Sequence, residues 1–169
     1  MSAIKSVRFF GAFVNPLVGA QGINAGDPFS GTLSYDTSAA PISTSPVTAT
    51  YQPMAFSVTF PNGMLTASHL TMRMSTDPQD PSIEVFGELP FNLFMGLLLR
   101  GPTGVIPNTN LPTHIALSNF LIKHFTLSDQ KGPLFGFDQT PTPPPGAKVF
   151  LRGNLNALRE HGIFHWWPW

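Results

Sequence analysis

The stretch DPFSGTLSYD, residues 27–36, contains the pattern that decides the fold. Apolar residues or glycine stand at positions 29, 31, 33 and 35, and hydroxyl residues stand at positions 30, 32 and 34. Because successive side chains of a strand point to opposite faces, this alternation predicts a β-strand with one buried and one wet face. A turn at residues 26–28 opens the strand, and a hydrogen-bonded corner at Tyr35-Asp36 is expected to end it.

The same alternation recurs along the chain and predicts about eight strands. Asn62-Gly63 predicts a hairpin between two of them, because this pair tolerates the positive φ of a type I′ turn. A short helical turn is expected at Leu117–Asn119, and residues 37–50 are expected to form an exposed connection. The predicted strands span residues 6–14, 29–35, 54–60, 64–74, 83–86, 91–100, 120–127 and 148–158.

Strands at intervals of 8 to 20 residues predict an all-β fold, either an antiparallel β-sandwich or a β-barrel. No repeat or second unit is evident, so residues 1–169 are predicted to form a single domain with an aromatic C-terminal tail, residues 159–169. Phe (15) far outnumbers Tyr (2), which favours dry packing or an apolar pocket.

Charge is scarce in this chain. Charged residues make up 11%, against about 25% in typical globular domains. Two explanations are equally weighted: a surface of uncharged polar residues, or a surface covered by a partner subunit or wrapped around an apolar cavity. Because the net charge is zero, the chain has no overall positive charge that would attract nucleic acid or acidic lipid.

Cysteine is absent, which excludes disulfides and thiolate metal sites. The longest apolar run, residues 89–99, is too short to span a bilayer as a helix, which needs about 20 residues. No secretory leader is visible, so the expected location is cytoplasmic, or exported if a leader has been removed.

The order of the segments resembles a β-rich family of exported bacterial proteins, many of which end in a PEP-CTERM sorting tail. The resemblance rests on FSGTLSYD at residues 29–36, on residues 51–60, on the LP…L…F segment at residues 111–120, and on RGNLNAL at residues 152–158. It implies a β-rich fold and a bacterial origin, and it implies no biochemical role. The chain departs from the family pattern because it shows neither the leader nor the sorting tail.

Three residues are candidates for catalysis. Glu84 and Glu88 flank a strand, where one carboxyl could point into a cavity and do acid–base work. Tyr51, or one of the five histidines, is a further polar group that could contact a ligand. Asp77 and Asp80 lie in a Pro-containing loop and are interpreted as turn formers.

The C-terminal tail supplies candidates for a ligand or subunit interface. Three tryptophans left in water would form an exposed apolar patch, so the tail is expected to dock on a barrel mouth or a neighbouring subunit, or to stack on sugars. His161 and His165 are four residues apart, but no third ligand is evident and no metal site is predicted. The candidate interface residues are Trp166, Trp167, Trp169, His165, Phe91 and Phe94.

These observations support three hypotheses. The first is a non-catalytic β-module for binding or self-assembly, expected to be a homo-oligomer. The alternative is a cofactor-free β-barrel enzyme of the isomerase or cyclase type that acts on an apolar small molecule. The third is glycan binding through the C-terminal tryptophans. No cofactor is predicted, since phosphate-binding loops, nucleophile elbows and metalloprotease motifs are all missing.

Overall fold

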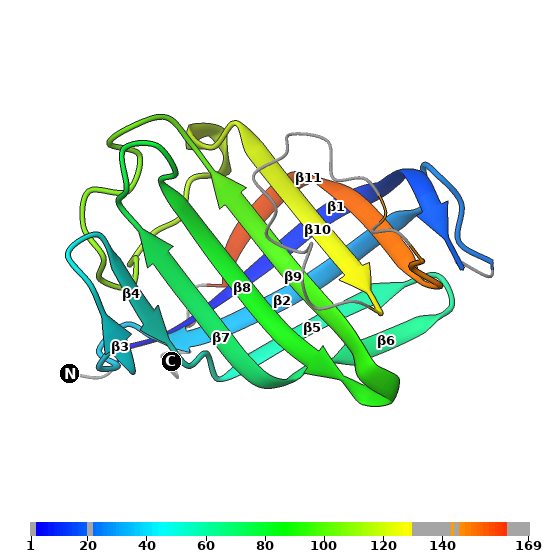
Figure 1. Cartoon of the computed structure of the whole chain (residues 1–169), viewed down its shortest axis with the longest axis horizontal. Coiled ribbons are helices and arrows are strands. Elements are labelled where there is room, and N and C mark those ends of the chain that lie inside the picture. The colour runs from blue at the N-terminus through cyan, green and yellow to red at the C-terminus, as the bar shows by residue number, and fades with distance from the viewer. Residues whose placement is uncertain (1–2, 20–21, 130–142, 144–145, 162–169) are drawn as a thin grey trace, which may run out of the picture.

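The computed structural model describes residues 3–19, 22–129, 143 and 146–161. All strands in these ranges join in one antiparallel sheet, which curls into a half-barrel (Figure 1). The all-β antiparallel prediction is confirmed. In the described ranges no helix is long and apolar enough to cross a bilayer.

The sheet has eleven strands in the described residues, rather than about eight. They lie in the order β3-β4-β7-β8-β9-β10-β11-β1-β2-β5-β6. The bounds are β1 Ile4–Val18, β2 Pro28–Asp36, β3 Ser43–Thr44, β4 Thr48–Tyr51, β5 Ala55–Phe60, β6 Gly63–Thr66, β7 Ser68–Ser75, β8 Ser82–Leu89, β9 Leu93–Arg100, β10 Ile122–Ser128 and β11 Phe150–His161.

The stretch at residues 27–36 forms β2, and its burial alternates along the strand as the sequence predicts. Strand β2 pairs with β1 on one side and β5 on the other. The hydroxyl of Ser34 donates to that of Ser6 on the outer face of the sheet (3.2 Å). The expected corner is also present, because the Asp36 carboxylate accepts hydrogen bonds from the amide and hydroxyl of Ser38.

The extra strands arise at two places. The segment expected as an exposed connection contains the short strands β3 and β4, which were missed because Ser, Thr and Pro dominate it. The strand predicted over residues 64–74 is divided by Ala67 into β6 and β7. The helical turn at Leu117–Asn119 is confirmed as the 3-10 turn η2.

The β5–β6 hairpin forms where the sequence predicts it, but the turn type is wrong. Phe60 pairs with Gly63, so Pro61 and Asn62 are the two central residues. The proline ring holds φ near −65°, which excludes a type I′ turn there. Positive φ occurs instead at Phe91 (65°) and Asn92 (56°), in the connection between β8 and β9.

The two limbs of the sheet meet where β6 runs into β7. The first half of this bent segment pairs with β5, and the second half pairs with β4 and β8. Between the halves, the Ala67 amide donates to the Phe56 carbonyl of β5 (2.9 Å). A Cβ placed at Gly87 of β8 would meet the Ala67 side chain at 2.3 Å. Strands from opposite limbs therefore pack at this corner and enclose the core.

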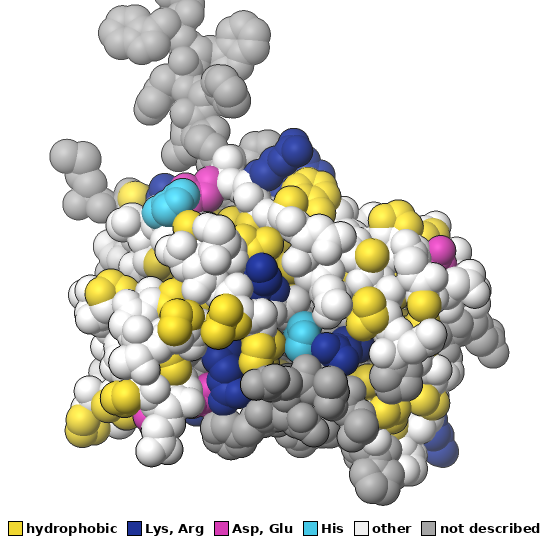
Figure 2. Space-filling view, turned by 90° about the horizontal axis from the view of Figure 1, so that it is seen from above, with side chains coloured by type: hydrophobic (Ala, Val, Ile, Leu, Met, Phe, Trp, Pro, Cys, Tyr) yellow, Lys and Arg dark blue, Asp and Glu magenta, His cyan; other side chains and the backbone are white. Residues whose placement is uncertain are grey.

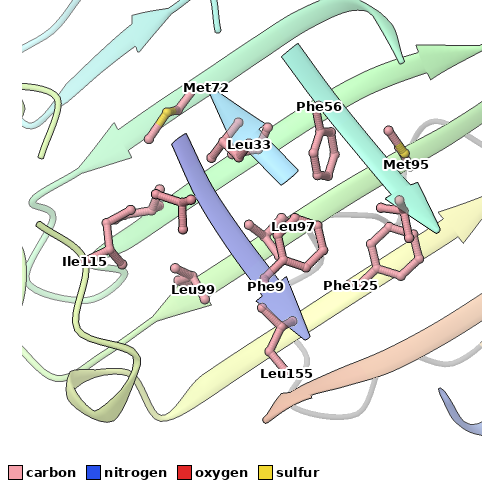
Figure 3. Packing of buried hydrophobic residues seen from close by; sticks show 14 of the residues in the cluster. Phe9, Leu33, Phe56, Met72, Met95, Leu97, Leu99, Ile115, Phe125 and Leu155 are labelled. Atoms are coloured by element: carbon pink, nitrogen blue, oxygen red, sulfur yellow. The ribbon is translucent and has the colours of Figure 1, made fainter. Parts of the chain in front are cut away.

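Large side chains fill the middle of the half-barrel (Figure 3). Phe9 and Phe56 are fully buried with ring centroids 6.0 Å apart, and Phe29 lies 5.2 Å from Phe125. Fully buried rings in contact with one another fill the interior here. Any room for a ligand must therefore be sought at an end of the half-barrel.

The scarcity of charge is visible on the surface. Figure 2 shows one face on which hydrophobic side chains form small separate groups and charged side chains are few. Uncharged polar side chains and backbone make up most of the rest. On this face, the low charge content of the chain corresponds to a polar but uncharged surface.

Candidate functional site

A pocket of about 430 Å³ opens at one end of the half-barrel. Its floor includes Met74 at the end of β7 and Ile83 at the start of β8, both on the core face of the sheet. The remaining wall comes from residues 105–120, between β9 and β10. Apolar groups from this wall are Ile106, Leu111, Ile115 and Phe120, and polar groups at the rim are Asn108, Asn110, Thr113, His114 and Asn119.

Residues 101–121, here called the capping segment, cross this end of the half-barrel. A connection of this length is uncommon in a compact fold and is usually a binding or active-site loop. Ile115 and Phe120 point into the core and hold the segment down by burial. The segment has no regular strand to satisfy its backbone, so its polar groups need other partners.

Two tyrosines supply such partners from the sheet. The Tyr35 hydroxyl of β2 donates to the Pro112 carbonyl (2.9 Å), and the Tyr51 hydroxyl of β4 donates to the Thr109 carbonyl (2.9 Å). Burial raises the pKa of both hydroxyls, and the charge of Glu160 raises that of Tyr35 further. Both tyrosines therefore stay protonated donors at all physiological pH values.

Glu160 of β11 is the third anchor and the centre of a charged cluster. Its Oε1 accepts a hydrogen bond from the Ile115 amide (3.1 Å) and lies 2.9 Å from Nδ1 of His114. Its Oε2 lies 3.5 Å from Nζ of Lys5 on β1. Burial raises the pKa of the Glu160 carboxyl. The Ile115 amide, His114 and Lys5 lower it and outweigh burial, so the carboxylate is ionised at neutral pH.

The pair of His114 and Glu160 has the geometry of an oriented base. With its proton on Nδ1, the imidazole donates to the carboxylate and leaves Nε2 as an acceptor. The His114 side chain is 71% exposed and lines the pocket rim. The site thus combines an apolar floor, rim amides and a hydroxyl for hydrogen bonding, and one group able to move a proton.

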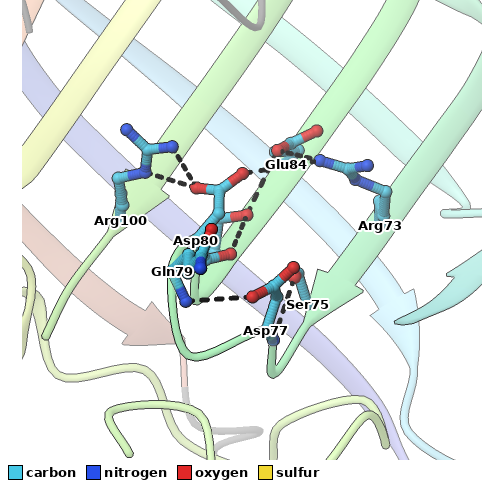
Figure 4. A network of polar contacts seen from close by, with 8 residues as sticks. Arg73, Ser75, Asp77, Gln79, Asp80, Glu84 and Arg100 are labelled. Atoms are coloured by element: carbon cyan, nitrogen blue, oxygen red, sulfur yellow. Dashed lines mark hydrogen bonds and ion pairs between the residues drawn. The ribbon is translucent and has the colours of Figure 1, made fainter. Parts of the chain in front are cut away.

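Glu84 and its neighbours lie elsewhere, on the outer face of the sheet (Figure 4). Oε1 of Glu84 lies 2.6 Å from Nη2 of Arg73 and accepts a hydrogen bond from the Ser82 hydroxyl (3.1 Å). The hydrogen bond to Glu84 raises the pKa of Arg73. Asp80 forms an ion pair with Arg100. This network ties β7, β8 and β9 together, and none of its residues lines the pocket.

The loop before β8 follows the sequence interpretation in part. The Asp77 carboxylate accepts a hydrogen bond from the Gln79 amide (2.9 Å), which is a turn-forming contact. The Asp77 amide in turn donates to the Ser75 hydroxyl (3.3 Å). Asp80 lies in the same turn and also forms an ion pair with Arg100, which the sequence interpretation did not include.

The other predicted site residues are spread over the molecule. Glu88 lies on the outer face with its Oε2 3.4 Å from Nδ1 of His69. Phe91 is 94% exposed in the connection between β8 and β9. Phe94 stacks on Phe86 with centroids 5.7 Å apart. Of the predicted catalytic residues, Tyr51 alone contacts the capping segment.

The tail residues His165, Trp166, Trp167 and Trp169 lie outside the described residues. The described ranges contain no group of three or more His, Asp or Glu side chains that could hold a metal ion. Comparison with known proteins found no matching family model, no matching curated protein and no matching solved structure.

Sequence reasoning allowed a histidine at the site without singling out His114, and it missed Glu160 and Lys5. Glu160 points toward the capping segment because a bulge in β11 shifts the register against β1 between Phe10 and Gly11. Alternation counted forward from Leu155, opposite Gly11, would have placed Glu160 on the outer face, whereas the bulge puts it opposite Val7 on the core face. No local pattern links His114, in an irregular segment, to a residue 46 positions later.

Proposed function

We propose that this protein is a binding module that takes a small, mainly apolar molecule into the pocket beneath the capping segment. The observation that carries the proposal is a preformed pocket of about 430 Å³ with an apolar floor and a hydrogen-bonding rim. Such sites orient a ligand through a few polar groups while burying its apolar body. The filled middle of the half-barrel limits the ligand to a size that this end can hold.

A neutral environment-sensitive dye, N-phenyl-1-naphthylamine, tests the proposal. Its fluorescence is expected to rise when it enters the pocket. Ala116→Trp places a large ring against the pocket wall and should abolish the rise. Ser118→Trp, an exposed position outside the pocket lining, is the matched control and should retain it. Equal fluorescence for both variants, or no rise with the native chain, would refute the proposal.

A second candidate function is acid–base catalysis in the same pocket, without a cofactor. Its support is the 2.9 Å contact between His114 and Glu160 at the rim. The reaction class would be proton abstraction and return on a carbon acid, as in an isomerase. Deuterium uptake by cyclohexanone in D₂O, followed by proton NMR, is expected to be faster with the native chain than with His114→Gln. Equal rates would exclude this chemistry for that probe.

Self-assembly is a further proposal for this chain. Its support is a set of large apolar side chains in water, among them Met64, Phe91 and Leu121. Sedimentation velocity over a wide range of concentrations is expected to show a dimer or larger species. A strict monomer throughout would contradict it. Glycan binding through the tryptophan tail is tested separately by a glycan array, where absence of signal counts against it.

A further inference from the structure

An arginine on the outer face of the sheet has no acidic partner in the described part of the chain. Arg152 of β11 is half-buried, and its Nη2 lies 2.8 Å from Nε2 of His124 on β10. None of the ion pairs among the described residues includes it. Withdrawing a guanidinium from water without a counter-charge is unfavourable, so this arrangement needs an explanation.

Two buried polar atoms lie beside this contact without a hydrogen-bond partner. They are Nε of Arg152 and Oγ1 of Thr126. Thr126 is 3% exposed and stands directly opposite Arg152 in the pairing of β10 with β11. On its other side, β9 presents Gly96, which has no side chain to satisfy the hydroxyl. Buried donors are nearly always paired, so two unpaired ones together indicate a place for an acceptor.

We propose that Arg152, Thr126 and His124 form a binding site for an oxyanion, meaning a phosphate, sulfate or carboxylate group. The guanidinium offers Nε–H and a terminal N–H in a fork that matches two oxygens of such a group. The Thr126 hydroxyl offers a third donor from the adjacent strand. The site is on the outer face of the sheet and is independent of the pocket beneath the capping segment.

His124 makes the site sensitive to pH. Burial, and next the Arg152 charge, lower the pKa of His124 to about 4, so the free imidazole is neutral and accepts from Arg152. An oxyanion held between them adds negative charge beside both groups and favours the imidazolium. Binding should therefore raise the pKa of His124 and become tighter as the pH falls.

Among the described residues, Arg152 is the charged side chain that contacts His124. Across β9 it faces Leu98, and across β11 it is paired with Asn154. Arg100, at the end of β9, is already paired with Asp80. Asp129 lies past the end of β10, where its Oδ2 accepts a hydrogen bond from the Lys148 amide.

NMR titration of the full chain with inorganic phosphate and, in a second arm, with acetate tests the site at constant ionic strength. We expect shifts at residues 124, 126 and 152, and a His124 pKa raised by about one unit or more in saturating anion. Arg152→Met and Thr126→Val should each weaken binding about ten-fold or more. Tighter binding of phosphate would identify a tetrahedral anion, and tighter binding of acetate a carboxylate.

Matched variants separate binding from folding. Arg159→Met removes an exposed arginine from the same strand and should leave the affinity unchanged. Thr126→Ser keeps the hydroxyl and should restore the binding that Thr126→Val loses. The site is refuted if neither anion shifts these resonances in the native chain. Equal loss of affinity in Arg159→Met and Arg152→Met would also refute it, since it would indicate general charge attraction.

Discussion

Phe91 is the most conspicuous single residue of the chain. It adopts φ 65° and ψ 29°, is followed by Asn92 at φ 56°, and is 94% exposed. The left-handed region costs a residue with a Cβ about 1–2 kcal/mol, and Asn tolerates it better than Phe. The ring is exposed, so its own burial does not offset this cost, and a use of the ring at an interface would account for the conformation.

Phe91→Asn is expected to raise the free energy of unfolding by about 1 kcal/mol, because it relieves the left-handed strain and removes an exposed ring. Urea unfolding followed by circular dichroism measures the change. Leu121→Asn is the control, since Leu121 is 77% exposed without positive φ and should change stability by less than about 0.5 kcal/mol. Equal gains in both variants would assign the effect to surface polarity alone.

Gly31 of β2 lies beneath the ring of Phe9. A Cβ there would stand 2.1 Å from Cζ of Phe9 and 2.6 Å from the Ser57 carbonyl oxygen. Gly31→Ala should therefore destabilise the fold by about 1–3 kcal/mol through overpacking, measured by urea unfolding. Ser30→Ala, the adjacent outward-facing position, should stay within about 0.5 kcal/mol. A tolerated Gly31→Ala would contradict the packing of Phe9 described above.

The Glu160 carboxylate predicts a pH dependence of stability. Its pKa is lower in the folded chain than the ordinary value of 4.5, so ionisation stabilises the fold above that value. The stability advantage of the native chain over Glu160→Gln should be constant near neutral pH. It should shrink as the pH falls below 4.5 and vanish below the folded pKa. Urea unfolding at several pH values checks this, and an advantage that grows in acid would contradict it.

At the scale of the elements, the capping segment depends on a few polar contacts. Tyr35→Phe and Tyr51→Phe each remove one hydrogen bond to it. A loss of about 1 kcal/mol should accelerate amide exchange of residues 109–116 roughly five-fold, measured by hydrogen–deuterium exchange. Thr103→Val removes a contact of the same segment to the Pro78 carbonyl and should affect only its own end. If amide exchange at residues 109–116 is unchanged in both tyrosine variants, burial of Ile115 and Phe120 is sufficient to hold the capping segment in place.

Period-two alternation was sufficient for the strands whose two faces differ in environment. Strand β2 followed it residue by residue, and the hairpin after Phe60 was found from Asn62-Gly63. The pattern was not recognised in β3 and β4, because these strands have only two and four residues, although burial does alternate along β4. The division into β6 and β7 changes the parity of the core-facing residues, from Leu65 and Ala67 to Leu70, Met72 and Met74. A single strand predicted over residues 64–74 does not account for that change.

The candidate site was much harder to predict than the strands. Tyr51 was singled out as a polar handle and lies against the capping segment, where its hydroxyl is an anchor. One of Glu84 and Glu88 was expected to point into a cavity, yet both lie on the outer face, beside Arg73 and His69 respectively. Strand β8 alternates Ile83, Val85 and Leu89 with Ser82, Glu84 and Glu88, so its period-two pattern already assigns both carboxylates to the face away from the core.

At the scale of the whole molecule, one sheet encloses a core of large rings and has a pocket of about 430 Å³ at one end. On the face shown in Figure 2, charged side chains are few and most of the surface is uncharged. The pocket and the proposed oxyanion site use different faces of the same sheet. A ligand at one site therefore has no direct contact with a ligand at the other.

The pairing of β1 with β11 has a consequence for synthesis on the ribosome. Strand β1 emerges early and gains β2 as a neighbour at once, but its second edge must wait for residues 150–161 to be translated. Until then the nascent sheet has an open seam whose backbone donors and acceptors can recruit another chain. Slow translation or holdase chaperones should thus matter most for yield in the interval before the last strand arrives.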